Sequence, residues 1–157
     1  MRTVRALCLA TLLLLTPLSL LATPATAVDT SVNVDTTWSG AIVLTGNVTV
    51  MNGSTLTLSP GTTVDGGDGY WIRVEGTLSA SHSDFFSSQV PLTSGSHGAG
   101  LWTGIYVTNK GHAVLSEVTI ENAKTGIKVE GNLSANKVTI KDSYIGINVI
   151  GSADITS

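Results

Sequence analysis

The sequence predicts an all-β fold, a solenoid of about five coils built from short parallel strands. The first observation is a repeat of about 20 residues, in which the segment Glu117–Asn122 (EVTIEN) recurs as Lys137–Asp142 (KVTIKD). The second is that apolar residues alternate over short runs, as in strands, and helical spacing is absent after residue 27. The third is that glycine, asparagine and aspartate separate these runs, as the sharp corners of a solenoid require.

Residues 1–27 have the features of a cleavable secretory signal peptide. Arg2 and Arg5 precede a long apolar stretch, and Ala25–Ala27 (ATA) matches the small-residue cleavage site. We therefore expect the mature chain to begin at Val28 and to be extracytoplasmic, either secreted or at the cell surface. The alternative is an uncleaved membrane anchor. The apolar stretch is interrupted and short for a span, so no membrane span is predicted in the mature chain.

The mature chain is acidic and has no cysteine. Removing Arg2 and Arg5 from 8 basic residues leaves 6, against 11 acidic residues, for a net charge of −5. Such a surface repels phosphate backbones, so nucleic acid is excluded as a partner. The single cysteine, Cys8, lies in the signal peptide, so neither disulfide bonds nor thiolate metal ligands are expected. The 130 remaining residues (157 − 27) are enough for one domain.

Residues 28–37 are interpreted as a polar lead-in, and residues 38–157 as the solenoid. The strands are predicted at Ile42–Leu44, Val48–Val50, Thr55–Leu58, Ile72–Val74, Ile105–Val107, Val118–Ile120, Ile127–Val129, Val138–Ile140 and Ile147–Val149. Runs related by the repeat begin at Val48, Ile72, Ile105, Ile127 and Ile147, with spacings of 24, 33, 22 and 20 residues. The longest spacing contains residues 87–100, which are rich in serine and glycine and are predicted to loop out of the coil.

Alternation within these strands separates inward from outward side chains. The inward columns are predicted to be Ile72/Val74, Ile105/Val107, Ile127/Val129 and Ile147/Val149, with a second column of Val118/Ile120 and Val138/Ile140. The outward columns are predicted to be Arg73, Tyr106, Lys128 and Asn148, and beside them Glu75, Thr108, Glu130 and Ile150. Corner positions are predicted at Asn122, Gly126, Gly131, Asp142, Gly146 and Gly151.

The segments Trp38–Val50 and Gly53–Val64 resemble the opening coils of secreted proteins of the pectate-lyase-like superfamily. The resemblance extends over nearly all of the mature chain, and it implies a right-handed parallel β-helix. That superfamily contains polysaccharide lyases and hydrolases, and also surface and periplasmic repeat proteins without established catalysis. The resemblance therefore implies a fold and leaves more than one function open.

The chain stops at Ser157, part-way through the coil that Ile147 opens, and no polar cap follows. A solenoid end without a cap exposes strand edges and apolar core. We therefore expect the chain to be a fragment of a longer protein. The alternative is that another chain covers this end through end-to-end self-association.

No catalytic, metal-binding or cofactor-binding site is predicted. The resemblance implies that an enzyme on this fold would use clustered carboxylates, but Thr108 separates Glu75 from Glu130 in the predicted column. The segment Asp65–Gly69 (DGGDG) lacks the ligand spacing of a calcium loop and is interpreted as a turn. The three histidines, at positions 82, 97 and 112, show no metal-ligand spacing.

The favoured function is a secreted, non-catalytic module for cell-surface structure, adhesion or glycan binding, with a polysaccharide or surface glycan as the partner. Trp38, Trp71 and Trp102 are either sugar-stacking or packing residues. We predict a carbohydrate-binding surface at Trp102 and Tyr106, beside the loop of residues 87–100. The alternative function is the N-terminal part of a polysaccharide lyase or glycoside hydrolase whose active coils lie beyond residue 157.

Overall fold

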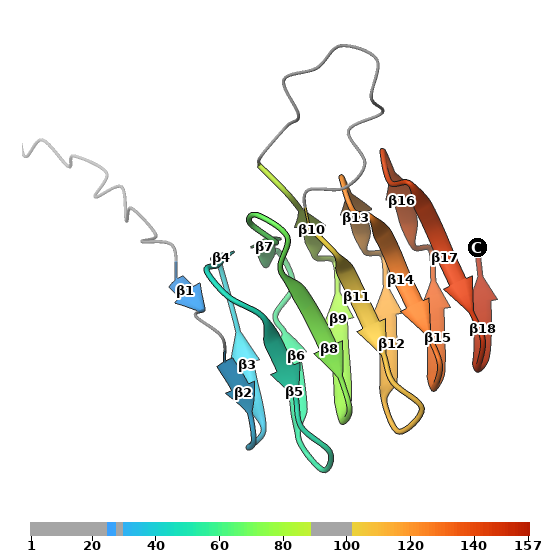
Figure 1. The fold of residues 1–157 in the computed structure, drawn as a ribbon, viewed down its shortest axis with the longest axis horizontal. Coiled ribbons are helices and arrows are strands. Elements are labelled where there is room, and N and C mark those ends of the chain that lie inside the picture. Colours follow the sequence, from blue (N-terminus) through green and yellow to red (C-terminus); the bar gives the residue numbers. More distant parts are fainter. Residues whose placement is uncertain (1–24, 28–29, 89–101) are drawn as a thin grey trace, which may run out of the picture.

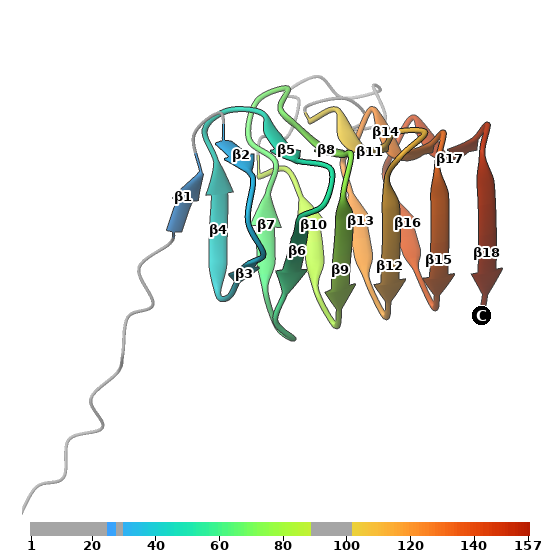
Figure 2. The ribbon, with the colours of Figure 1, turned by 90° about the horizontal axis from the view of Figure 1, so that it is seen from below.

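The computed structural model describes residues 25–27, 30–88 and 102–157. These residues form 18 strands and no helix, and every strand pairing is parallel. The strands belong to three six-stranded sheets, which the chain visits in turn, so that each strand pairs with the third strand before it and the third after it. Figures 1 and 2 show the coils stacked along one axis. The predicted parallel β-helix is therefore confirmed, with five full coils from β4 to β18.

The three sheets are named A, B and C in the order in which the chain enters them. Sheet A contains β1 (Ala25–Ala27), β4 (Ala41–Leu44), β7 (Thr63–Asp65), β10 (Asp84–Phe86), β13 (Thr119–Glu121) and β16 (Thr139–Lys141). Sheet B contains β2 (Thr30–Val32), β5 (Val48–Val50), β8 (Trp71–Val74), β11 (Gly104–Val107), β14 (Thr125–Val129) and β17 (Ile145–Val149). Sheet C contains β3 (Thr36–Trp38), β6 (Thr55–Leu58), β9 (Thr77–Ser81), β12 (His112–Ser116), β15 (Asn132–Asn136) and β18 (Ser152–Thr156).

The predicted lead-in contributes strands to the solenoid. Strand β2 lies within it, and β3 spans its last two residues and Trp38. These strands pair in parallel with β5 and β6. Most of the predicted signal peptide lies outside the described residues, as does most of the predicted loop of residues 87–100. No helix long and apolar enough to cross a membrane occurs in the part of the chain that the structure describes.

The inward columns of sheet B are stacked as predicted. Ile72, Ile105 and Ile127 occupy the same register position on β8, β11 and β14, and each is at most 1% exposed. The second predicted column is also present, since Ile120 of β13 is directly paired with Ile140 of β16. Each fully buried aliphatic side chain contributes about 1.5–3 kcal/mol relative to an exposed one. These columns therefore supply much of the free energy that holds the coils together.

Sheet C was largely missed by the sequence prediction, because its later strands alternate small residues with large ones. The inward pair of residues is Leu78/Ala80 in β9, Ala113/Leu115 in β12, Leu133/Ala135 in β15 and Ala153/Ile155 in β18. In register, a large residue therefore always meets a small one in the neighbouring coil. This alternation keeps the inward volume of these four coils nearly constant, as close packing of the interior requires. Strands β7 and β10 of sheet A were missed as well.

The corner between sheet C and sheet A has one residue of positive φ in every full coil. These residues are Gly40, Gly61, His82, Glu117 and Lys137, with φ between 47° and 80°. The side chains of the last three stack: His82 Nε2 lies 3.0 Å from Glu117 Oε2, and Lys137 Nζ lies 3.7 Å from Glu117 Oε1. The predicted corner residues Asn122 and Asp142 also have positive φ, at the corner from sheet A to sheet B.

The inward register of β9 is testable with two neighbouring substitutions. Leu78 is fully buried and Ser79 points outward. Leu78→Asp should abolish folding, because losing the leucine and burying a carboxylate costs at least about 5 kcal/mol of a total stability of about 5–15 kcal/mol. Ser79→Asp should change stability by less than about 0.5 kcal/mol. Urea unfolding followed by circular dichroism measures both, and similar effects of the two would show that β9 is wrongly registered.

At the corner between sheets C and A, glycine in place of a residue of positive φ is expected to stabilise the protein. Lys137 has a φ of 51°, a conformation that costs a non-glycine residue about 1–2 kcal/mol, and its ion pair with Glu117 is exposed and long. Lys137→Gly should therefore raise the free energy of unfolding by about 0.5–1 kcal/mol after the larger unfolded-state entropy of glycine is subtracted. The control is Asn136→Gly in the adjacent strand β15, which should lower the unfolding free energy by a similar amount. Destabilisation by both substitutions would contradict the prediction.

Candidate functional site

A groove with a volume of about 300 Å³ lies on the outward face of sheet B, over β8, β11 and β14. We call it the sheet B groove, and Figure 1 labels the three strands beneath it. Its lining residues are Trp71, Thr103, Gly104, Ile105, Tyr106, Lys124, Thr125 and Lys128. Gly104 of β11 is in register with Trp71 of β8. Gly104 also lines the groove, so the coil after Trp71 contributes no side chain beside the indole at this position.

Gly104 is required by the backbone as well as by the groove. Its φ is +105°, and a Cβ at this position would lie 1.7 Å from the carbonyl oxygen of Thr125 in the next coil. No other residue type fits such a position without displacing the backbone. The close approach of β11 and β14 therefore requires glycine at this position of the groove lining.

Tyr106 forms one wall of the groove and is held from three sides. Arg73 Cζ lies 5.5 Å from the centre of its ring and Lys128 Nζ lies 4.5 Å from it, on the strands before and after. Its hydroxyl donates a 2.5 Å hydrogen bond to Glu130 Oε2, and this bond raises the pKa of Tyr106. Tyr106 is therefore a fixed, neutral side chain at neutral pH.

The charged groups around Tyr106 are each paired with a residue two positions along the chain. Arg73 Nε lies 2.8 Å from Glu75 Oε1, and Lys128 Nζ lies 2.7 Å from Glu130 Oε1. The hydrogen bond from Lys128, followed by that from Tyr106, lowers the pKa of the Glu130 carboxyl. Lys124, by contrast, is exposed and forms no ion pair among the described residues. The sheet B groove therefore presents one uncompensated positive charge.

The predicted column of Glu75, Thr108 and Glu130 is wrong at its middle member. Strand β11 ends at Val107, and Thr108 turns into the corner, where it is 5% exposed and donates a 3.0 Å hydrogen bond to the Val74 carbonyl. Thr108 therefore satisfies a backbone acceptor and does not separate two outward carboxylates. The two glutamates each form an ion pair with a cation of their own coil, Glu75 with Arg73 and Glu130 with Lys128.

Trp102, which we predicted to lie on a carbohydrate-binding surface, is buried. Trp102 is 1% exposed, its ring stacks on Phe85 with centroids 6.4 Å apart, and its Nε1 donates to the Glu121 carbonyl at 2.9 Å. Gly66 makes room for it, since a Cβ there would lie 2.5 Å from the indole. Trp102 is thus a packing residue, the alternative that the sequence left open. Tyr106 does line the groove, and the exposed indole beside it is that of Trp71, which is 37% exposed.

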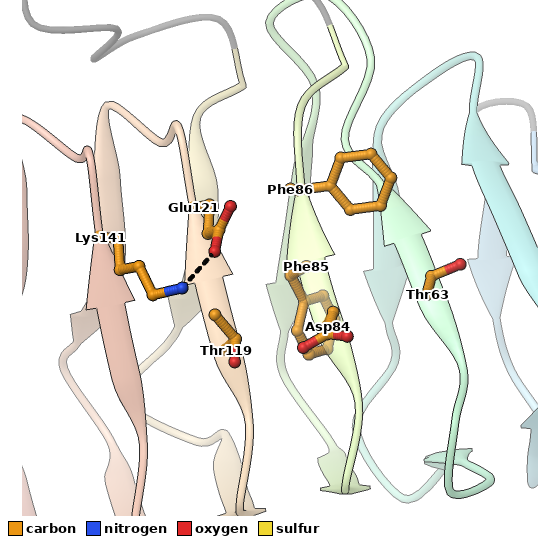
Figure 3. Close-up of a pocket in the computed structure, with 7 residues that line it drawn as sticks. All are labelled: Thr63, Asp84, Phe85, Phe86, Thr119, Glu121 and Lys141. Carbon is orange, nitrogen blue, oxygen red and sulfur yellow. Dashed lines mark hydrogen bonds and ion pairs between the residues drawn. The ribbon is translucent and has the colours of Figure 1, made fainter.

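A second groove, with a volume of about 410 Å³, lies on the outward face of sheet A. We call it the sheet A groove. Figure 3 shows the side chains that line it, which are Thr63, Asp84, Phe85, Phe86, Thr119, Glu121 and Lys141. The sequence prediction missed it because β7 and β10, which carry four of these residues, were not recognised as strands. The alternation of Asp84 and Phe86 about the buried Phe85 was the one available signal.

The remaining candidates from the sequence do not form a site. His82 pairs with Glu117, His112 lies on β12, and His97 is outside the described residues. Asp65 Oδ1 accepts hydrogen bonds from the backbone N–H groups of Gly67 at 3.0 Å and Ser88 at 3.2 Å, so its carboxylate caps the predicted turn. No group of three histidine, aspartate or glutamate residues placed to hold a metal ion occurs among the described residues.

The lowered pKa of Glu130 predicts a pH-dependent contribution to stability. Because the folded-state pKa lies below the unfolded one, this contribution is complete above the ordinary pKa of glutamate and is lost as the pH falls through the lowered value. Glu130→Gln should therefore destabilise the protein by a constant amount near neutral pH, and the difference from the original chain should shrink in acid. Urea unfolding at a series of pH values measures this difference. A difference that stays the same into strong acid would contradict the assignment.

Comparison of the chain with protein-family models, with curated proteins and with solved structures finds no match. The described residues form a parallel β-solenoid with outward grooves on sheets A and B. The chemistry of these grooves is the basis for a function.

Proposed function

We propose that this protein is a secreted or cell-surface β-helix module that binds an acidic polysaccharide in the sheet B groove and does not cleave it. The observation that carries the proposal is the exposed indole of Trp71 beside a groove in which the neighbouring strand contributes Gly104, a residue without a side chain. The apolar face of a sugar ring stacks on an indole, and the missing side chain at Gly104 leaves room for the ring beside Trp71.

The charge of the sheet B groove favours an acidic sugar. Lys128 lines the groove but is committed to Glu130, whereas Lys124 lines it without an ion-pair partner among the described residues. A carboxylate of a uronic acid residue would accept a charge-assisted hydrogen bond from the Lys124 ammonium. Such a contact adds to stacking on Trp71 and distinguishes acidic from neutral polymers.

Binding without cleavage is supported by the state of the carboxylates on this face. Glu75 and Glu130 each accept a hydrogen bond from a cation, and the pKa of Glu130 is lowered. A general acid needs a carboxyl that is protonated at working pH, which a lowered pKa opposes. The groove thus has the stacking and charge needed for recognition, and its paired glutamates are suited to holding Tyr106 and Lys128 in place.

The proposal is tested by titrating the mature chain with acidic and neutral polysaccharides in calorimetry, together with variants. Trp71→Ala should weaken binding of an acidic polymer about tenfold, because stacking is worth roughly 1 kcal/mol or more. The matched control is Tyr144→Ala, which removes an aromatic residue that is 78% exposed outside the groove and should leave affinity unchanged. Lys124→Gln should weaken binding of acidic polymers and leave binding of neutral ones as it was.

Two results would overturn the proposal. One is unchanged affinity after Trp71→Ala, which would place the ligand elsewhere. The other is release of unsaturated or reducing sugar ends during incubation with the polysaccharides, which would show lyase or hydrolase activity in place of simple binding.

A further inference from the structure

The sheet A groove combines hydroxyl groups, a carboxylate and an aromatic ring on three successive coils. Thr63 of β7, Asp84 of β10 and Thr119 of β13 occupy the same register position, so their side chains form one outward row. Phe86 lies two residues after Asp84 on the same strand, about 6.6 Å along it. Figure 3 shows Asp84 between the two threonines, with the Phe86 ring at the β7 side of the groove.

The groove has an excess of negative charge. Lys141 forms a 2.8 Å ion pair with Glu121, and it also experiences the charges of Asp142 and Asp84, which contribute to raising its pKa. Among the residues that line the groove, one ammonium group against two carboxylates, those of Asp84 and Glu121, leaves one negative charge (1 − 2 = −1). The Asp84 carboxylate makes no hydrogen bond or ion pair with any described residue. A ligand that brings a positive charge to Asp84 would therefore relieve repulsion that the protein does not neutralise.

We propose that the sheet A groove binds a protonated amino sugar residue of a polysaccharide. In this arrangement the ammonium group donates to Asp84, the apolar face of the sugar ring packs on Phe86, and its hydroxyl groups hydrogen-bond to Thr63 and Thr119. One sugar residue covers the distance along the strand between Asp84 and Phe86, which is about 6.6 Å. The ammonium group of a lysine side chain in a peptide would satisfy Asp84, but it offers no hydroxyl groups to the threonines. This site is separate from the sheet B groove and prefers ligands of the opposite charge.

The test compares two oligosaccharides of equal length, a glucosamine oligomer with free amino groups and its fully N-acetylated form. Calorimetry is done at a mildly acidic pH, where the amino groups are protonated and aspartate is ionised. The protein should bind the free-amine oligomer about tenfold more tightly, since a hydrogen bond between charged groups is lost on acetylation. Asp84→Asn should remove this preference. Asp154→Asn, which removes an exposed aspartate on β18 of sheet C, should keep it.

The remaining measurements separate this site from general attraction and from the sheet B groove. An acidic protein attracts any polycation, so an oligolysine of matched charge is titrated in parallel and should bind more weakly than the glucosamine oligomer. Trp71→Ala, which disables the other groove, should leave binding of the glucosamine oligomer unchanged. The proposal is overturned if Asp84→Asn keeps the preference for the free amine, if oligolysine binds equally well, or if Trp71→Ala abolishes the binding.

Discussion

The parallel, in-register hydrogen bonding of each coil to the next is the constraint on which the rest of this structure depends. It extends into the corners, where the backbone N–H groups of His82, Glu117 and Lys137 donate to carbonyl groups of the following coil at 2.8–2.9 Å. A chain that satisfies its backbone in this way has little freedom in coil length, because an extra residue inside a strand would turn its inward side chains outward. Length variation is therefore confined to corners, and the longest insertion lies between sheets A and B.

Close stacking also explains the residue types inside and at the corners. The interior must be filled in every coil, and from β9 onward sheet C achieves this by exchanging the large and the small member of each inward pair from coil to coil. At the corner between sheets C and A the backbone needs a positive φ in each full coil, and this need is met by glycine twice and by charged or polar residues three times. Where glycine is absent, the conformational strain is partly offset by the stacked side chains of His82, Glu117 and Lys137.

The same constraint builds the outward faces. Residues 20 or more positions apart in the chain, such as Arg73, Tyr106 and Lys128, become direct neighbours because three strands share one register. A rigid scaffold of this kind holds side chains at fixed spacing, which suits recognition of a repeating polymer. The two grooves differ in sign of charge, since Lys124 is uncompensated over sheet B and Asp84 over sheet A.

The sequence by itself determined the solenoid, the inward residues of sheet B and the outward row containing Tyr106, because a repeat of about 20 residues and strict alternation follow directly from stacked strands. It also indicated the corners at Asn122 and Asp142. Only the tertiary structure decided that Trp102 is buried and Trp71 exposed, because burial of an aromatic ring depends on what packs against it, here Phe85 and the space left by Gly66. The sheet A groove was likewise beyond the sequence. Four of its residues lie on β7 and β10, which were not recognised as strands, and only stacking of the coils brings Thr63, Asp84 and Thr119 together.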